Sequence, residues 1–363
     1  MNLVRYNHRM NGWMPAILTL CLLLESCHQS QPTDGSFSAS SSLPKHLQVP
    51  NQGAYTGAFI DFGDTEDDVT LTAIEDFAQL VGKSQAIVAS SSYWGEQSFP
   101  RRNIDIISRY GAIPLIYWSP WDKPYEQNTP PGRFDLQKIL AGQYDTYIDH
   151  WADEAKRFGS PVFVAWGLEM NGTWFPWSGY FYNKNNQFGP GIYKKCYRYV
   201  VDRVRARGAS NILWVFHVNN FSSPPDFWNQ IGNYYPGPDY VDWLGMSVYG
   251  KQFGKGPWVK FHDAMDYPYQ QLCKLDPKLP IMLAEWGVGE YPDSGSKAEW
   301  IQEGFSRMSA NYPRLKAVVY WHERWQNSDG TYSNLRVNSS PEALQAYRDG
   351  LGTSYWIGRP LWK

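Results

Sequence analysis

Eight short apolar runs recur along this chain from about residue 54, and each is continuous rather than alternating with polar residues. Continuous apolar runs of this length are typical of strands buried on both faces, as in a parallel sheet. Segments with helical character separate the runs, and several of them end in glycine, as helix C-termini do. We expect strands at residues 57–63, 86–94, 113–120, 162–169, 212–219, 241–249, 281–288 and 317–324.

Eight strand–helix repeats predict an α/β fold of the (β/α)8 or TIM-barrel type. The length of 363 residues suffices for one large domain of this kind. A doubly wound open sheet is the alternative, but no glycine-rich phosphate-binding turn follows the first expected strand. We therefore place a single (β/α)8 domain at residues 49–363.

The first 48 residues do not fit this repeat. An apolar run over residues 14–24 follows two arginines, has the proportions of a signal peptide, and is short for a membrane span. The sequence LESC that ends at Cys27 is similar to the lipobox of bacterial lipoproteins, although Glu25 replaces the usual small residue. We expect a lipoprotein-type signal peptide over residues 1–26 and a Ser-rich linker over residues 27–48. The protein would then be held at the bacterial cell envelope or surface; a secreted protein with an ordinary signal is the alternative.

Two cysteines, Cys196 and Cys273, lie outside the signal and the anchor. The chain has no CxxC pair and no histidine at zinc spacing from either, so no zinc site is predicted. We expect both thiols to pack as small apolar groups, and a disulfide between them stays open.

The ends of the expected strands locate the site, because active sites in these barrels lie at the C-terminal face. Strands four and seven end at Glu169 and Glu285, and strands three apart in an eight-stranded barrel face each other across the mouth. The other strands end in Asp61, Trp94, Trp118, His217, Tyr249 and Trp321. We expect the mouth to hold two carboxylates among aromatic rings.

Paired carboxylates are what cleavage of a glycosidic bond requires. One is protonated and helps the leaving oxygen depart, while the other is ionised and attacks, or activates water. Glu169 precedes Trp174 and Trp177, whose apolar rings would favour its neutral form, and a donor such as Tyr249 would keep Glu285 charged. A salt-bridged or capping role is the ordinary alternative for each glutamate.

The aromatic content points toward the same chemistry. Aromatic residues form 17% of the chain and include 18 Trp, which is more than core packing usually needs. Stacking on the faces of sugars is a common use of so many rings. Trp94, Trp118, Trp121, Trp177 and Trp325 are candidate stacking rings, with core packing as the alternative for each. A net charge of −2 predicts no broad basic surface for nucleic acid.

The segment LEMNGTWFPW around Glu169 resembles the acid/base motif of glycoside hydrolase family 26. The likeness continues in DYVDWLGMSVYG, LAEWG, YWHERW and SSPEALQAYR, so it covers most of residues 54–350. The resemblance implies a (β/α)8 barrel of the large retaining clan, with Glu169 as acid/base and Glu285 as nucleophile. It also implies that Tyr249 hydrogen-bonds the nucleophile.

The same resemblance implies that Trp174 and Trp321 help to form sugar subsites. The family consists mainly of endo-β-1,4-mannanases, with smaller groups that cleave mixed-linkage β-glucan or β-1,3-xylan. This chain departs from the family pattern at two positions near the cleavage point, where Leu168 replaces a usual His and Ala165 a common Arg. The catalytic pair is kept, and the change puts specificity for mannan in question.

We predict a retaining endo-β-glycanase that acts by double displacement on β-1,4-mannan or a related glycan, with mixed-linkage β-glucan and β-1,3-xylan as alternatives. A non-catalytic carbohydrate-binding protein on the same barrel is the alternative of another class. We expect no metal or organic cofactor, a monomer, and membrane contact only through a lipid at Cys27. The expected substrate-binding residues are Trp174, Tyr249, Trp321, Trp177, His217 and Trp118, and a purely structural role is the alternative for the histidine.

Overall fold

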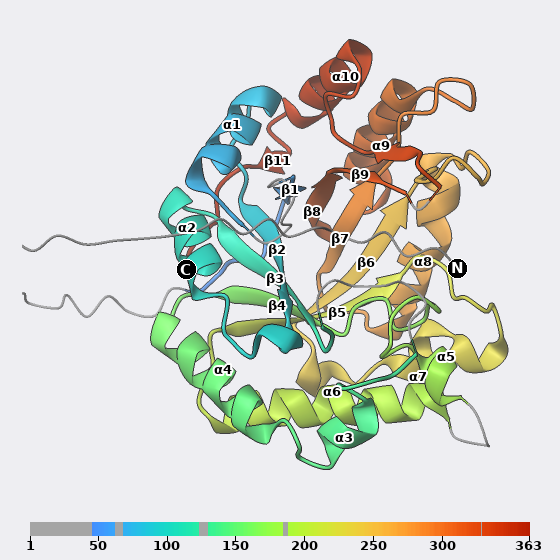
Figure 1. Cartoon of the computed structure of the whole chain (residues 1–363). Coiled ribbons are helices and arrows are strands. Elements are labelled where there is room, and N and C mark those ends of the chain that lie inside the picture. The colour runs from blue at the N-terminus through green and yellow to red at the C-terminus, as the bar shows by residue number, and fades with distance from the viewer. Residues whose placement is uncertain (1–45, 62–67, 123–129, 184–187, 328) are drawn as a thin grey trace, which may run out of the picture. The chain divides into compact units, whose positions relative to one another are not determined.

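Eight parallel strands close into a barrel in the computed structural model, which describes residues 46–61, 68–122, 130–183, 188–327 and 329–363 (Figure 1). The strands pair in chain order and β8 pairs back with β1, which confirms the predicted (β/α)8 fold. The signal sequence, Cys27 and nearly all of the expected linker lie outside the described residues. The barrel strands are β1 (Ala54–Ile60), β2 (Ile87–Tyr93), β3 (Ile113–Ser119), β4 (Val162–Trp166), β5 (Ile212–Asn219), β6 (Trp243–Tyr249), β7 (Ile281–Gly287) and β8 (Leu315–His322).

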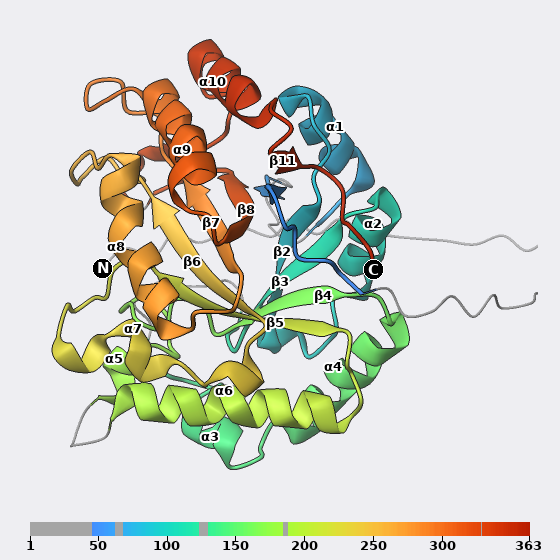
Figure 2. The ribbon, with the colours of Figure 1, turned by 180° about the vertical axis from the view of Figure 1, so that it is seen from behind.

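Helices surround the barrel (Figures 1 and 2). Thr70, Ser296 and Ser340 begin three of them, and each accepts a hydrogen bond from a backbone N–H of the first turn. In the part of the chain that the structure describes, no helix combines the length and the apolar character that a membrane crossing needs. The helices are α1 (Leu71–Val81), α2 (Arg101–Tyr110), α3 (Leu136–Leu140), α4 (Asp145–Phe158), α5 (Gly179–Tyr182), α6 (Gly189–Ala206), α7 (Ile231–Tyr234), α8 (Phe261–Leu275), α9 (Lys297–Asn311) and α10 (Pro341–Leu351).

The main core lies between the sheet and the helices. Trp118 on β3 stacks on Trp151 of α4 with 4.1 Å between ring centroids, and Trp286 on β7 packs edge-on against Phe305 of α9. Successive side chains of a strand point to opposite faces, so the neighbours of these tryptophans point into the barrel. Cys196 and Cys273 are both free thiols, and Cys196 is buried in this core.

Short pairings complete the barrel domain. A hairpin of β9 (Arg324–Gln326) and β10 (Tyr332–Asn334) follows β8, and β11 (Trp356–Ile357) pairs in parallel with the start of β1. Leu47, which we had placed in the linker, forms an antiparallel bridge with Trp362. The folded domain therefore begins slightly earlier than the sequence suggests.

Candidate active site

Both predicted glutamates lie toward the C-terminal end of the barrel and are buried. Glu285 is on β7, as expected, and is 7% exposed. Glu169 is 8% exposed and lies in the turn after β4, because that strand ends at Trp166 rather than at the glutamate. The turn rather than the strand therefore aims the Glu169 carboxyl.

The turn holds Glu169 in an unusual backbone conformation. Gly167 and Glu169 both have positive φ, 56° and 52°, which glycine adopts readily and a glutamate adopts at a cost in free energy. Hydrogen bonds fix the turn on both sides: the Gly167 N–H donates to Trp118 O at 3.2 Å, and the Glu169 N–H donates to His217 O at 2.8 Å. The neighbouring strands β3 and β5 thus determine where Glu169 points.

The Asn171 side chain ties the same turn to the end of β5. Its amide nitrogen donates to Asn219 O at 3.0 Å, and its amide oxygen accepts from Asn219 N at 2.9 Å. Both side chains are buried, so the pairing satisfies polar groups that would otherwise be costly. Asn171 is therefore part of the support of the site.

Gly172 makes room for the indole of Trp174. A Cβ at Gly172 would lie about 2.5 Å from that ring. With the ring in this position, Trp174 Nε1 donates to Glu169 Oε2 at 2.7 Å. Trp174 therefore contacts the carboxyl directly, a role beyond the sugar subsite that the sequence suggested.

Glu285 receives a hydrogen bond from Tyr249, as predicted. The Tyr249 hydroxyl donates to Glu285 Oε2 at 2.7 Å. The nearby Tyr117 hydroxyl donates to the carbonyl of Ala284 at 2.8 Å. Both tyrosines extend from strands into the mouth of the barrel, and the Tyr249 donor favours the ionised form of Glu285.

Burial dominates the electrostatics of the glutamate pair. It raises the pKa of Glu169, against hydrogen bonds from Ser247 and Trp174 that lower it. Burial and the charge of Glu169 raise the pKa of Glu285 well above its usual range, while Tyr249 and Ser247 lower it. Because each charge disfavours the other, the pair is suited to hold one proton near neutral pH.

The remaining predicted substrate contacts divide into two groups. Trp174 and Trp321 are partly exposed at the mouth, and Trp321 stacks on Phe59 with 4.0 Å between ring centroids. Trp325, on β9, is also partly exposed. These three rings remain candidates for sugar stacking.

The other predicted rings are buried, which corrects their expected role as sugar contacts. Trp118 packs between β3 and α4, and Trp177 stacks on Phe175 while its Nε1 donates to Leu168 O at 2.7 Å. Neither has a free face for a sugar, and Trp94 is likewise in the core and Trp121 nearly so. His217 is also buried, at 1% exposed, so it does not reach substrate directly.

Two residues of the site were not predicted. Ser247 is buried beside His217, with 2.8 Å between Oγ and Nε2, and Tyr117 lies among the same groups. A signal for Ser247 was present, since it is two residues before Tyr249 on a strand and therefore shares its face. Among the described residues, no group of three or more His, Cys, Asp or Glu side chains could hold a metal ion.

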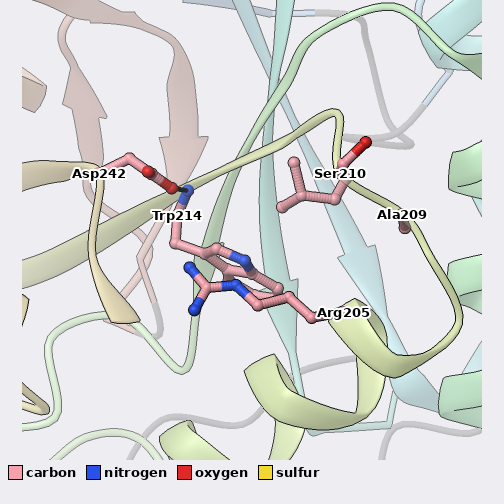
Figure 3. A pocket seen from close by; sticks show the side chains of 6 residues that line it. Arg205, Ala209, Ser210, Trp214 and Asp242 are labelled. Atoms are coloured by element: carbon pink, nitrogen blue, oxygen red, sulfur yellow. Dashed lines mark hydrogen bonds between the residues drawn. The ribbon is translucent and has the colours of Figure 1, made fainter. Parts of the chain in front are cut away.

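A separate pocket of about 280 Å³ lies at the opposite end of the strands (Figure 3). Its lining includes Arg205, Trp214 near the start of β5, and Asp242 just before β6. The Asp242 carboxylate accepts a hydrogen bond from the Trp214 backbone N–H at 2.7 Å, and this bond accounts for an acidic side chain in the pocket lining. None of the predicted site residues lines this pocket, and the paired glutamates remain the candidate active site.

Two known proteins resemble this chain in sequence. The chain is 31% identical over 313 residues to Endoglucanase H of Acetivibrio thermocellus, which covers 83% of this chain and 31% of the relative. It is 26% identical to a mannan endo-1,4-beta-mannosidase of Bacillus subtilis, over 64% of this chain and 58% of the relative. The chain thus spans about a third of the length of the first relative and rather more than half of the length of the second.

A solved structure of the Bacillus subtilis mannanase BCman has the same fold. It superposes with a TM-score of 0.59 at 20% identity, covering 86% of this chain and 89% of that one. Residues 48–295 match the family described as Glycosyl hydrolase family 26, a match over more than half of the chain. The chain belongs to glycosyl hydrolase family 26.

Proposed function

We propose that this protein is a retaining endo-β-glycanase in which Glu285 is the nucleophile and Glu169 the general acid and base. The observation that carries the proposal is the pair of buried carboxyls at the ends of β4 and β7, each with a hydrogen-bond donor. Buried paired carboxylates in an aromatic mouth are the arrangement that glycoside cleavage uses.

The reaction proceeds in two displacements. Glu285 attacks the anomeric carbon while the bond to the leaving oxygen breaks, and Glu169 gives that oxygen its proton. Water then attacks the same carbon, Glu169 takes a proton from it, and the bond to Glu285 breaks. The Tyr249 hydroxyl supports Glu285 as the ionised partner, because an O–H donor stabilises a carboxylate strongly.

The pKa shifts and the Tyr249 hydrogen bond favour opposite roles for Glu285. The pKa of Glu285 is raised further than that of Glu169, which would favour the proton on Glu285. The role of Glu285 as nucleophile rests on the Tyr249 donor and on the family resemblance. The roles of the two glutamates therefore need a test that is separate from the overall activity.

A β-glucan with 1,4 linkages is the first candidate substrate. The likeness to a protein named as an endoglucanase extends over 83% of this chain. Leu168, beside Glu169, offers an apolar side chain where a His would offer a hydrogen bond, and loss of such a contact relaxes selection among sugar epimers. β-1,4-Mannan is the second candidate, supported by the likeness to a mannan endo-1,4-beta-mannosidase over 64% of the chain.

Product release on a panel of polysaccharides tests the activity. Mixed-linkage β-glucan, glucomannan, linear mannan and β-1,3-xylan are compared at equal concentration, with reducing ends and viscosity both measured. We expect fastest release from β-glucan, with an early fall in viscosity that marks cleavage inside the chain. Binding to insoluble glycan without any product would instead favour the non-catalytic carbohydrate-binding alternative.

Azide rescue tests the roles of the glutamates. With an activated aryl glycoside, Glu285→Ala should lose several orders of magnitude in rate, and azide should then give the glycosyl azide of inverted configuration. Glu169→Ala should still form the glycosyl-enzyme, and azide should give the azide of retained configuration. Glu303→Gln, a carboxylate on α9 that contacts His262, is the matched control and should be unaffected. Exchanged configurations would reverse the two assignments.

We also propose that Cys27 carries a lipid that holds the protein at the cell envelope. The proposal rests on the lipobox-like sequence alone, since Cys27 lies outside the described residues. Mass spectrometry of the mature N-terminus should find an acylated Cys27, and Cys27→Ser should lose the acyl chains and the membrane fraction. An unmodified N-terminus would favour plain secretion.

A further inference from the structure

Ser247 lies at the point where the two glutamates and His217 meet. On β6 it is in register with Glu285 of β7 on one side and with Asn219 of β5 on the other. Paired residues of parallel strands point to the same face, so Ser247 faces the barrel interior together with Glu285. The serine is fully buried, and its hydroxyl must find its partners within this cluster.

His217 determines which way the Ser247 hydroxyl can donate. Its Nε2 is 2.8 Å from Ser247 Oγ, and its Nδ1 is buried with no hydrogen-bond partner among the described residues. Burial lowers the pKa of His217 to about 3, so the ring is neutral and carries one hydrogen. We assign that hydrogen to Nε2, because a buried N–H without an acceptor costs more than a lone pair without a donor.

With Nε2 donating to its oxygen, the Ser247 hydroxyl keeps its own hydrogen for another acceptor. The acceptors within reach are the two carboxyls, and a hydrogen bond from Ser247 favours the ionised form of each. The other polar groups that face the cluster are already committed. Tyr117 donates to Ala284 O, Tyr249 donates to Glu285, and the Glu323 carboxylate accepts from Trp321.

We propose that Ser247 is a positioning residue whose single hydrogen is donated to whichever of Glu169 and Glu285 is ionised. The inference rests on the proposed function above. In the form of the free enzyme that reacts in the proposed mechanism, the ionised partner is Glu285. Once Glu285 has bonded to the sugar, its charge is gone and Glu169, which has given up its proton, becomes the carboxylate. Rotation about the Ser247 Cβ–Oγ bond then moves the donor to Glu169, so one hydroxyl serves both displacements.

Ser247→Ala is the direct test. In the free enzyme the variant loses the donor to ionised Glu285, so the acid limb of kcat/KM should move to higher pH by about one unit. In the glycosyl-enzyme it loses the donor to Glu169, so the acid limb of the deglycosylation step should move to higher pH by a similar amount. The rate at the optimum should fall about tenfold to a hundredfold. A role in packing alone would lower the amount of folded enzyme and leave the positions of both acid limbs unchanged.

Three further variants make the test specific. Ser247→Thr keeps the hydroxyl and should restore the wild-type limbs. Ser247→Cys, with a weak S–H donor, should shift both acid limbs partway and serves if Ser247→Ala does not fold. Ser90→Ala removes a buried hydroxyl from β2 and is the matched control. Ser90 pairs with Ile116 of β3, and the next residue, Tyr117, points inward, so Ile116 and Ser90 both face the helices. Ser90→Ala should therefore change neither acid limb.

The outcomes separate this inference from the proposed function. If Glu169→Ala and Glu285→Ala are inactive but folded Ser247→Ala or Ser247→Cys keeps the wild-type limbs, the role of Ser247 is refuted and the mechanism stands. A shift of the acid limb of only one of the two steps would also refute it, because the hydroxyl would then serve a single carboxyl. If the glutamate variants remain active, the proposed function itself is wrong.

Discussion

Trp174→Phe separates two functions of one side chain. Phenylalanine keeps a flat ring at the mouth but has no N–H to donate to Glu169 Oε2, a bond of 2.7 Å in the wild type. Hydrogen bonds to charged groups contribute about 1.5–3 kcal/mol, and we take the lower end because this bond is only partly buried. About 1.5 kcal/mol corresponds to roughly one pKa unit.

The sign of the shift follows from the direction of the bond. The indole N–H stabilises the ionised form of Glu169 and so lowers its pKa; its removal raises the pKa. Glu169 must be protonated in the first displacement, so the basic limb of kcat/KM should move up by about one pH unit. The second displacement needs Glu169 ionised and should slow at acid pH. KM should change by less than about threefold, since most of the stacking surface remains.

The assay is the pH dependence of hydrolysis of the best polysaccharide from the panel, with the first turnover of an activated aryl glycoside followed separately. Trp325→Phe is the matched control, because its Nε1 donates to Asn327 Oδ1 at 3.1 Å rather than to a carboxylate. That variant should leave the basic limb in place. An unmoved basic limb in Trp174→Phe, together with a manyfold rise in KM, would show that Trp174 acts through stacking alone.

Three other changes have defined outcomes. Gly172→Ala should displace the Trp174 ring, reproduce the pH shift of Trp174→Phe, and lower the free energy of unfolding by about 1–3 kcal/mol in urea titrations. Glu285→Gln should raise the melting temperature at pH 7 by a few degrees in calorimetry, because it removes a carboxylate whose burial is costly; a lower melting temperature would contradict this. Burial lowers the pKa of Lys297 to about 7, below its unfolded value, so the unfolded chain binds more protons between pH 7 and 10. The stability of the wild type relative to Lys297→Met should therefore increase over that range in urea titrations, and a flat difference would refute the assignment.

The barrel strands were predictable because each is an apolar run that is buried on both faces. The run expected at residues 281–288 is β7 at Ile281–Gly287, and the other strands also agree closely except at a few ends. The pairings of β9 with β10 and of β11 with β1 were not predicted. Strands of two or three residues have no periodic pattern to detect, and only the folded chain brings β11 beside β1.

The positions of the glutamates were predicted better than their surroundings. Tyr249 was correctly expected to bond Glu285, since both end strands and face the mouth. Trp118 was wrong as a sugar contact, because an apolar run does not reveal which of its side chains face inward. Trp177 was wrong because its loop folds the indole onto Phe175. The turn that aims Glu169 depends on hydrogen bonds to two neighbouring strands, and no local sequence pattern encodes such partners.

The pairing of β1 has a consequence for how a cell makes this protein. One edge of β1 is covered by β8, and its first residues, Ala54 and Tyr55, pair with β11. Both partners come from the last part of the chain, so during translation the first strand emerges long before they exist. An apolar strand with an open edge is a template for pairing with other chains. Until Trp356 has been added, Ala54 and Tyr55 lack the β11 partner that they have in the folded chain, and a ribosome that stalls late would release a chain with that short edge exposed.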